Sequence, residues 1–197
     1  METKTEIRKR LIERRNMLSI EEVNEKSAAI FERLCALKQY DHAKIVLAYM
    51  DYKNEVMTGE FIKRCKRDGK RVVLPKVEPV GGSKALSVSD KVLLVYEINE
   101  VERDTVSGFK GILEPNSAFL NRMDPIDIDL AIIPAVAFDY GRYRLGYGGG
   151  FYDRFIPLLR SDCTIAGVAY NLQLVEKIPV EKYDMPVNLV VTEYEFI

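Results

Sequence analysis

The segment from Arg142 to Arg154 holds the densest group of residues that could do chemistry. Its four glycines fall within five positions: Gly146, Gly148, Gly149 and Gly150. Glycine tolerates positive φ and lets main-chain N–H groups approach a ligand with no Cβ in the way. Arginines at positions 142, 144 and 154 add positive charge. Bare amides between cations predict a phosphate-binding loop, helped by the amino end of the helix expected to follow.

This loop matches neither of two common phosphate-binding patterns. No lysine and hydroxyl residue follow it, as GxxxxGK[ST] requires, and Phe151 occupies the last glycine position of GxGxxG. A loose surface loop is the alternative interpretation. The apolar and aromatic residues among the glycines instead favour a packed loop with an aromatic contact surface: Leu145, Tyr147, Phe151 and Tyr152.

Charged side chains around the loop each allow two interpretations. Asp153 falls in the first turn of the expected helix, where an acid either balances the helix dipole or, beside phosphates, binds Mg²⁺. Residues 3–17 predict another helix, with Lys4, Arg8 and Arg15 along one stripe. That stripe is either a solvated cationic face or a phosphate clamp.

The remaining reactive residue types exclude several kinds of chemistry. His42 is the only histidine, which excludes a two-histidine metal site and argues against a Ser-His-Asp triad; we expect it in a surface loop. Cys35, Cys65 and Cys163 form no metal-binding or disulfide spacing, so reduced cysteines in a cytoplasmic protein are expected. Chemistry must rest on carboxylates, cations and main-chain amides, with or without a metal held by oxygen.

Buried strands and amphipathic helices alternate along the chain and must position these groups. Apolar runs of strand length occur at 44–50, 71–75, 129–139, 164–170 and 188–193. Helices are predicted at 3–17, from Ser19 to Gln39 behind a Ser19–Glu22 capping box, for about ten residues after a Thr58 cap, and at 151–160, where Pro157 kinks or shortens the helix.

The segment 78–125 predicts an irregular insertion, with short strands at 85–90 and 92–98 and a loop at 108–117 broken by Pro115. Across 1–197 the alternation predicts one α/β domain. Its expected fold is a Rossmann-like three-layer sandwich, with a mainly parallel central sheet and helices on both faces.

Composition sets limits on partners. The 197 residues include 29 basic and 30 acidic side chains, for a net charge of -1, and 47% are hydrophobic. Nothing in this balance calls for nucleic acid, and no apolar run has membrane-spanning length. We expect a cytoplasmic monomer that binds small molecules, with neither a nucleic-acid nor a membrane partner.

Several segments together resemble one enzyme family. "RLGYGGGFYDRF" is similar to the signature loop of 5-formyltetrahydrofolate cyclo-ligases, and "KTEIRKRLIERR" resembles that family's basic N-terminal helix. Supporting segments follow in the family's order: "NEVMT", "GKRVVLPKV", "GILEPN", "AVAFD" and "YDMPVNLVVTE". The resemblance implies ATP-dependent conversion of 5-formyltetrahydrofolate to 5,10-methenyltetrahydrofolate with Mg²⁺, releasing ADP and phosphate. Phosphorylation of the formyl oxygen would activate it to leave.

The resemblance also implies site residues. ATP as co-substrate would contact Lys4, Thr5, Glu6, Ile7 and Arg8, and the loop Arg144, Leu145, Gly146, Tyr147, Gly148, Gly149, Gly150, Phe151 and Tyr152. The folate substrate would contact Arg8, Met50, Glu55, Tyr147, Gly148, Gly149, Gly150 and Phe151. Arg144 and Tyr152 would be catalytic, and Asp153 and Asp184 would hold Mg²⁺.

Three positions depart from the family pattern. Phe151 stands where tyrosine is common, Tyr183 where histidine is frequent, and Asn188 where aspartate is frequent. The departures leave open, as an alternative function, a non-catalytic folate- or nucleotide-binding module of the same fold. An RNA-associated protein and, by fold analogy alone, a sugar-phosphate isomerase are further alternatives.

Overall fold

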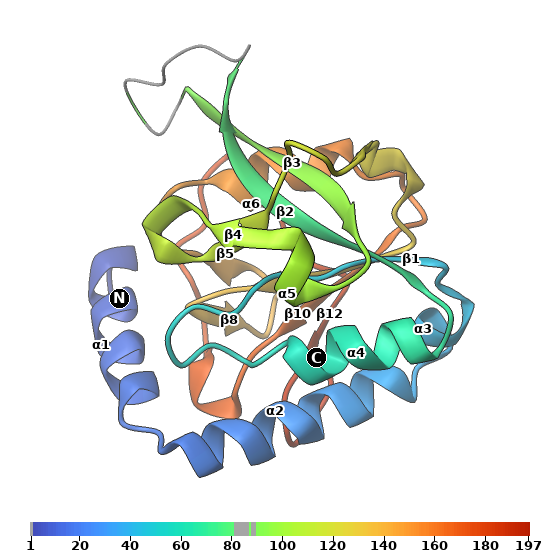
Figure 1. The fold of residues 1–197 in the computed structure, drawn as a ribbon. Helices are drawn as coiled ribbons and strands as arrows, with labels where there is room; N and C mark the ends of the chain where they lie inside the picture. The colour runs from blue at the N-terminus through green and yellow to red at the C-terminus, as the bar shows by residue number, and fades with distance from the viewer. Residues whose placement is uncertain (1, 81–86, 88–89) are drawn as a thin grey trace.

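A seven-stranded sheet forms the centre of the computed structural model, which describes residues 2–80, 87 and 90–197 (Figure 1). Its order is β12-β10-β7-β1-β2-β3-β6. The strands are β1 (Ile45–Leu47), β2 (Arg71–Pro79), β3 (Lys91–Ile98), β6 (Arg122–Met123), β7 (Leu130–Pro134), β10 (Thr164–Val168) and β12 (Leu189–Val191). Five neighbours from β12 to β2 run parallel, and β3 and β6 add antiparallel pairs. The predicted mainly parallel sheet is confirmed.

The order of the parallel strands defines where a ligand should bind. Counted along the chain and read from β2 to β12, the five strands follow the order 2-1-3-4-5. This is a doubly wound arrangement whose strand order reverses between β1 and β7. Ligands of such sheets bind outside the carboxyl ends of the strands at this switch point.

Helices cover both faces of the sheet. In Figure 1, α2 (Ile20–Cys35) and α4 (Gly59–Arg67) lie below the sheet, with α3 (Lys38–His42) beside them, and α6 (Phe151–Phe155) lies on the other side. Strand β1 shows why the apolar runs are continuous: Val46 packs in the cluster under α2 and α4, whereas Leu47 packs in the cluster with Phe155. The predicted three-layer sandwich is confirmed, although α6 and the 3-10 turn Ile156–Leu158 make a thin second layer.

The N-terminal helix α1 (Lys4–Asn16) packs on a second, smaller sheet rather than on the main one. That sheet has the order β11-β8-β9, from Leu174–Val175, Ala137–Asp139 and Arg144–Leu145. Ile7 and Leu11 of α1 are buried against Val136, Ala137 and Leu145. A capping box between Thr3 and Glu6 fixes the start of the helix. The small sheet therefore brings α1 beside the glycine loop.

The predicted single strand at 129–139 is wrong. It divides into β7 and β8, which belong to different sheets. The chain leaves β10 after Pro134, and the N–H of Val136 donates to the carbonyl of Leu145 instead. A continuous apolar run signals burial along its whole length but cannot show that two sheets share the burial.

Several predicted boundaries also need correction. The helix predicted to reach Gln39 ends at Cys35, and His42 closes α3 rather than lying in a loop, although its side chain is exposed. The strand predicted at 44–50 is ordered as a strand only over Ile45–Leu47. Thr58 precedes α4 but does not cap it, because its hydroxyl donates to the carbonyl of Tyr49 at 2.6 Å.

The predicted irregular insertion contains regular structure. β2 and β3 form a long antiparallel ladder that rises above the body in Figure 1, which confirms a strand at 92–98. After α5 (Val101–Asp104), β4 (Thr105–Ser107) pairs with β5 (Leu113–Pro115), so Pro115 ends a strand within the predicted loop. The strand predicted at 85–90 lies outside the described residues except at positions 87 and 90.

Candidate active site

A cavity of about 1170 Å³ opens at the switch point of the sheet. Tyr49 and Met50, just after β1, line it together with Pro134 and Ala135, where β7 ends. The glycine loop between β9 and α6, the helix α1 and the β4–β5 hairpin complete the wall. Segments far apart in sequence therefore meet where the strand order predicts a ligand.

The glycine loop is a packed part of this wall. Leu145 is buried against α1, and Gly148 and Gly150 take positive φ of 98° and 61°. A Cβ at Gly149 would lie 2.8 Å from the ring of Phe151, so the aromatic ring packs directly on the main chain. With only five residues, α6 supplies a weak dipole, and the loop itself must supply most donors toward a phosphate.

Helix α1 contacts the first glycine of the loop through Arg8. Arg8 Nε donates to the carbonyl oxygen of Gly146 at 2.8 Å. Lys4, Thr5 and Arg8 line the cavity. The two residues between them do not, because Glu6 caps its own helix and Ile7 is buried in the α1 core.

Arg144 is the buried cation of the site. Its Nη2 lies 2.8 Å from Asp153 Oδ1, and its guanidinium stands 5.3 Å from the centre of the Tyr152 ring. Burial lowers the pKa of Arg144, and the Asp153 charge opposes that shift. Within the described ranges, Arg144 Nε is buried without an acceptor. An unsatisfied, buried N–H costs free energy, so this group is a donor that water or a bound molecule could satisfy.

Glu55 is a buried carboxylate that lines the same cavity. It accepts from the main-chain N–H of Tyr52 at 3.0 Å, and its Oε1 lies 3.8 Å from Arg15 Nη1. Burial raises the pKa of Glu55, and the Arg15 charge opposes the rise. Arg15 also donates to the hydroxyl of Tyr147 in the glycine loop.

The sequence placed Arg15 only on a cationic stripe and did not predict its burial. A spacing of seven from Arg8 puts both residues on one side of α1. Whether that side meets solvent or protein is decided by the packing of the 49–58 segment against the helix, which local spacing does not encode. Arg15 is 1% exposed.

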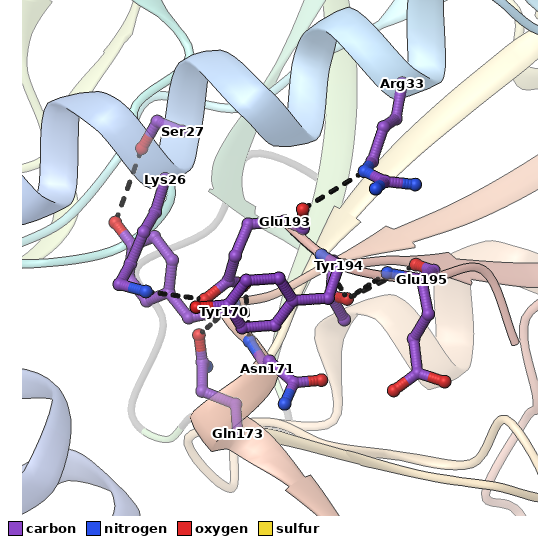
Figure 2. A network of polar contacts seen from close by, with 10 residues as sticks. Lys26, Ser27, Arg33, Tyr170, Asn171, Gln173, Glu193, Tyr194 and Glu195 are labelled. Carbon is purple, nitrogen blue, oxygen red and sulfur yellow. Dashed lines mark hydrogen bonds and ion pairs between the residues drawn. The ribbon is translucent and has the colours of Figure 1, made fainter.

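A polar network fixes the main chain that carries Glu55, and Figure 2 shows the part of it around Ser27 and Tyr170. The hydroxyl of Tyr170 donates to the carbonyl of Glu55 at 2.8 Å and lies 3.4 Å from Ser27 Oγ of α2. Beside it, Glu193 accepts from Lys26 and from the main chain of Asn171, as Figure 2 shows. Tyr170 and Glu193, which follow β10 and β12, thus connect the carboxyl ends of these strands to helix α2. Through Tyr170, the same network fixes the main chain at Glu55.

The β4–β5 hairpin adds residues that sequence reasoning missed. Phe109, Lys110 and Glu114 line the cavity. The rings of Phe109 and Phe151 meet edge to face, with centroids 6.3 Å apart. In the sequence, the only signal for this region was the "GILEPN" segment of the family resemblance, which implied no role for any of its residues.

Two carboxylates face the cavity as candidates for Mg²⁺. Asp153 pairs with Arg144, and Asp184 accepts from Lys4 Nζ at 2.6 Å. No group of three or more His, Cys, Asp or Glu side chains among the described residues could hold a metal by itself. Mg²⁺ typically takes one or two carboxylates together with substrate phosphates, and this donor set suits that mode.

The three family departures fall on different surroundings. Asn188 does not line the cavity; its Oδ1 accepts from the main chain of Ile165 at 2.7 Å and ties β12 to β10. Tyr183 lines the cavity but is largely exposed, and Phe151 packs in the loop. Asn188 thus has a structural role.

The fold and this site define a doubly wound α/β protein with its ligand cavity at the switch point of the sheet. Comparison with known proteins then gives the family. The family model described as the 5-formyltetrahydrofolate cyclo-ligase family matches residues 1–193, and the chain belongs to this enzyme family. The resemblance inferred from the sequence motifs is confirmed.

Individual relatives agree with this assignment. The chain is 33% identical over 181 residues to 5-formyltetrahydrofolate cyclo-ligase of Escherichia coli K12, covering 91% of this chain and 94% of the relative. The NMR structure of Aquifex aeolicus 5,10-methenyltetrahydrofolate synthetase superposes with a TM-score of 0.80 at 30% identity, covering 98% and 91% of the two chains. A Mycoplasma pneumoniae 5,10-methenyltetrahydrofolate synthetase gives 0.75 at 26% identity, covering 96% and 98%. Among the described residues, no helix has the length and apolarity to cross a membrane.

Proposed function

We propose that this chain converts 5-formyltetrahydrofolate to 5,10-methenyltetrahydrofolate with consumption of ATP, releasing ADP and phosphate. One observation carries the proposal within this family. The bare amides of the glycine loop, Arg8 and the buried Arg144 converge on a single cavity at the switch point.

The phosphate end of the proposed site rests on charge and unsatisfied donors. Arg144 Nε is buried and has no acceptor within the described part of the chain, and the loop glycines have no Cβ to keep a ligand from their main-chain N–H groups. Lys4 and Arg8 bring further charge from α1. Fixed cations and amides of this kind stabilise the charge that develops on a transferring phosphoryl group.

In the proposed reaction, the formyl oxygen attacks the γ-phosphorus of ATP, and ADP leaves. The neighbouring folate amine then attacks the activated formyl carbon. Loss of phosphate completes the methenyl bridge. Arg144 would neutralise the transferring oxygens, and Tyr152, whose ring lies under its guanidinium, would hold that cation in position. Holding both substrates in the reacting geometry can contribute about 7–11 kcal/mol.

Mg²⁺ would be held by Asp153 and Asp184 together with the nucleotide phosphates, and it would supply charge neutralisation. Without ligand, Asp184 forms an ion pair with Lys4, and Asp153 forms one with Arg144. In the loaded site, Lys4 and Arg144 would be released toward phosphate oxygens. The expected nucleotide contacts of Lys4, Thr5 and Arg8 and of the loop from Arg144 to Tyr152 are part of this proposal, whereas Glu6 and Ile7 do not line the cavity.

The folate end would lie beside Glu55, Met50 and Tyr147. Met50 and the tyrosine rings supply an apolar wall for a flat heterocycle, and the Glu55 carboxylate accepts hydrogen bonds from its N–H groups. The alternative of a non-catalytic module relied on three departures, and one of them, Asn188, contacts β10 outside the cavity. That observation removes one of its supports.

The test is a spectroscopic assay with purified protein, 5-formyltetrahydrofolate, ATP and Mg²⁺. We expect the methenyl absorbance band to rise only when both ATP and Mg²⁺ are present, with one ADP formed per product. Gly149→Val is the variant to compare with the wild type, because its side chain would collide with the Phe151 ring and distort the loop. We expect it to lose the rise in absorbance. Absence of any rise from folded wild-type protein would refute the proposal.

A further inference from the structure

A second buried carboxylate lines the cavity, away from Glu55. Glu114, in the middle of β5, is 7% exposed and lines the cavity wall. Its Oε1 accepts from the main-chain N–H of Val77 at 3.3 Å, a long hydrogen bond. Among residues 2–80, 87 and 90–197, no lysine or arginine forms an ion pair with it. Glu55, by comparison, has Arg15 beside it.

The backbone around Glu114 is shaped to admit this carboxylate. A Cβ on Gly108 would lie 2.0 Å from Glu114 Oε2, so the side chain fits only because position 108 is bare. Burying a carboxylate is costly unless hydrogen-bond donors compensate it. The protein supplies one long bond to Oε1, which leaves Oε2 for a donor from a bound molecule.

The glycine loop separates the two carboxylates. At its start, Tyr147 contacts Arg15 and faces the ring of Tyr52, on the Glu55 side. At its end, the ring of Phe151 contacts the ring of Phe109. Phe109 follows Gly108 in the chain, and Gly108 lies against the Glu114 side chain. A molecule with phosphates on the loop can therefore extend toward either carboxylate.

We propose that Glu114 accepts a hydrogen bond from the nucleoside half of the nucleotide, through a ribose hydroxyl or the exocyclic amino group of the base. This inference rests on the proposed function, in which the folate occupies the Glu55 side. Apolar residues border Glu114, as a purine ring requires: Val77, Leu93, Phe109 and Ile112. The carboxylate would orient the nucleoside among them.

Calorimetric titration in the absence of folate tests this directly. The probes are ATP, 2′-deoxy-ATP, 3′-deoxy-ATP and purine riboside triphosphate, which lacks the amino group. We expect the wild type to bind one analogue about tenfold more weakly than ATP, because a hydrogen bond to a charged group is lost. The analogue affected identifies the donor.

Glu114→Gln is the decisive variant. Its amide oxygen still accepts from Val77, but an NH₂ group replaces the oxygen that faces the ligand. We expect this variant to bind ATP and the affected analogue equally. Gly108→Ala displaces the same carboxylate from the other side and should give the same loss, so it decides the question if Glu114→Gln does not fold. Glu97→Gln, on β3 and paired with Arg71, is the matched control that keeps full discrimination.

Three results would overturn the inference: no discrimination by the wild type, unchanged discrimination by both Glu114→Gln and Gly108→Ala, or a raised folate KM in these variants with unchanged nucleotide affinity. The assay needs no turnover. Glu114-dependent nucleotide binding in a chain that fails to convert folate would contradict the proposed function and leave this inference standing.

Discussion

At the scale of single residues, the site is governed by buried charges and their partners. Arg144 and Arg15 are each at least nine-tenths buried, and each has an Nε without an acceptor within the described residues. Glu55 is held between Arg15 and the main chain of Tyr52. Such groups are expensive to bury, and they are retained where they position or bind a ligand.

The raised pKa of Glu55 gives a prediction for stability. Because its folded pKa lies above the ordinary 4.5, ionising Glu55 disfavours the folded state as pH rises through and above that value. Glu55→Gln removes this titration. It also leaves Arg15 without a carboxylate partner, and the free-energy cost of that loss in the variant does not depend on pH. The free energy of unfolding of the variant minus that of the wild type should therefore increase from pH 4 to pH 7. Urea unfolding at both pH values measures it, and a difference that falls with pH would contradict the buried environment of Glu55.

At the scale of elements, two sheets meet through close contacts at small residues. Gly167 of β10 lies against the ring of Phe138 in β8, where a Cβ would be 2.5 Å from the ring. The main sheet and the small sheet can pack together only because β10 has no side chain at Gly167. The small sheet in turn supports α1 and the start of the glycine loop.

Gly167→Ala should therefore destabilise the fold by about 1–3 kcal/mol, since the added methyl overpacks a closed core. Gly59→Ala is the matched control: nothing lies within 4 Å of its added Cβ, and the residue begins α4. We expect the control to be neutral or more stable by about 0.4–1 kcal/mol. Urea unfolding of the two variants would show equal effects if the sheet contact at Gly167 were loose.

At the scale of the whole molecule, the cavity collects segments from both ends of the chain. Helix α1 is joined to the glycine loop by Arg8, and Lys4 reaches Asp184 near the C-terminus. A ligand that binds the loop must also act on α1, because Arg8 and Arg15 of α1 both hydrogen-bond to the loop. Binding one nucleotide should thus stabilise segments more than a hundred residues apart in sequence.

Hydrogen exchange followed by mass spectrometry tests that coupling. With ATP and Mg²⁺ at about 100 times Kd, binding adds about 2.7 kcal/mol of stability, and protection should rise together in α1 and in residues 144–152. Arg8→Met removes the hydrogen bond to Gly146 and should reduce the protection of α1 more than that of the loop. Arg14→Met, on the exposed side of α1, is the control. Protection confined to the loop in the wild type would show that α1 is not part of the nucleotide site.

Sequence patterns and tertiary packing contributed different parts of this description. The apolar runs, the Ser19–Glu22 capping box and the glycine spacing determined the α/β class, most element positions and the family, because each depends on residues close together in the chain. Only the tertiary structure decided that 129–139 serves two sheets, that Arg15 is buried against Glu55, and that Glu114 faces the cavity. These features depend on contacts between segments distant in sequence, and local periodicity carries no information about which segment will cover a given side chain.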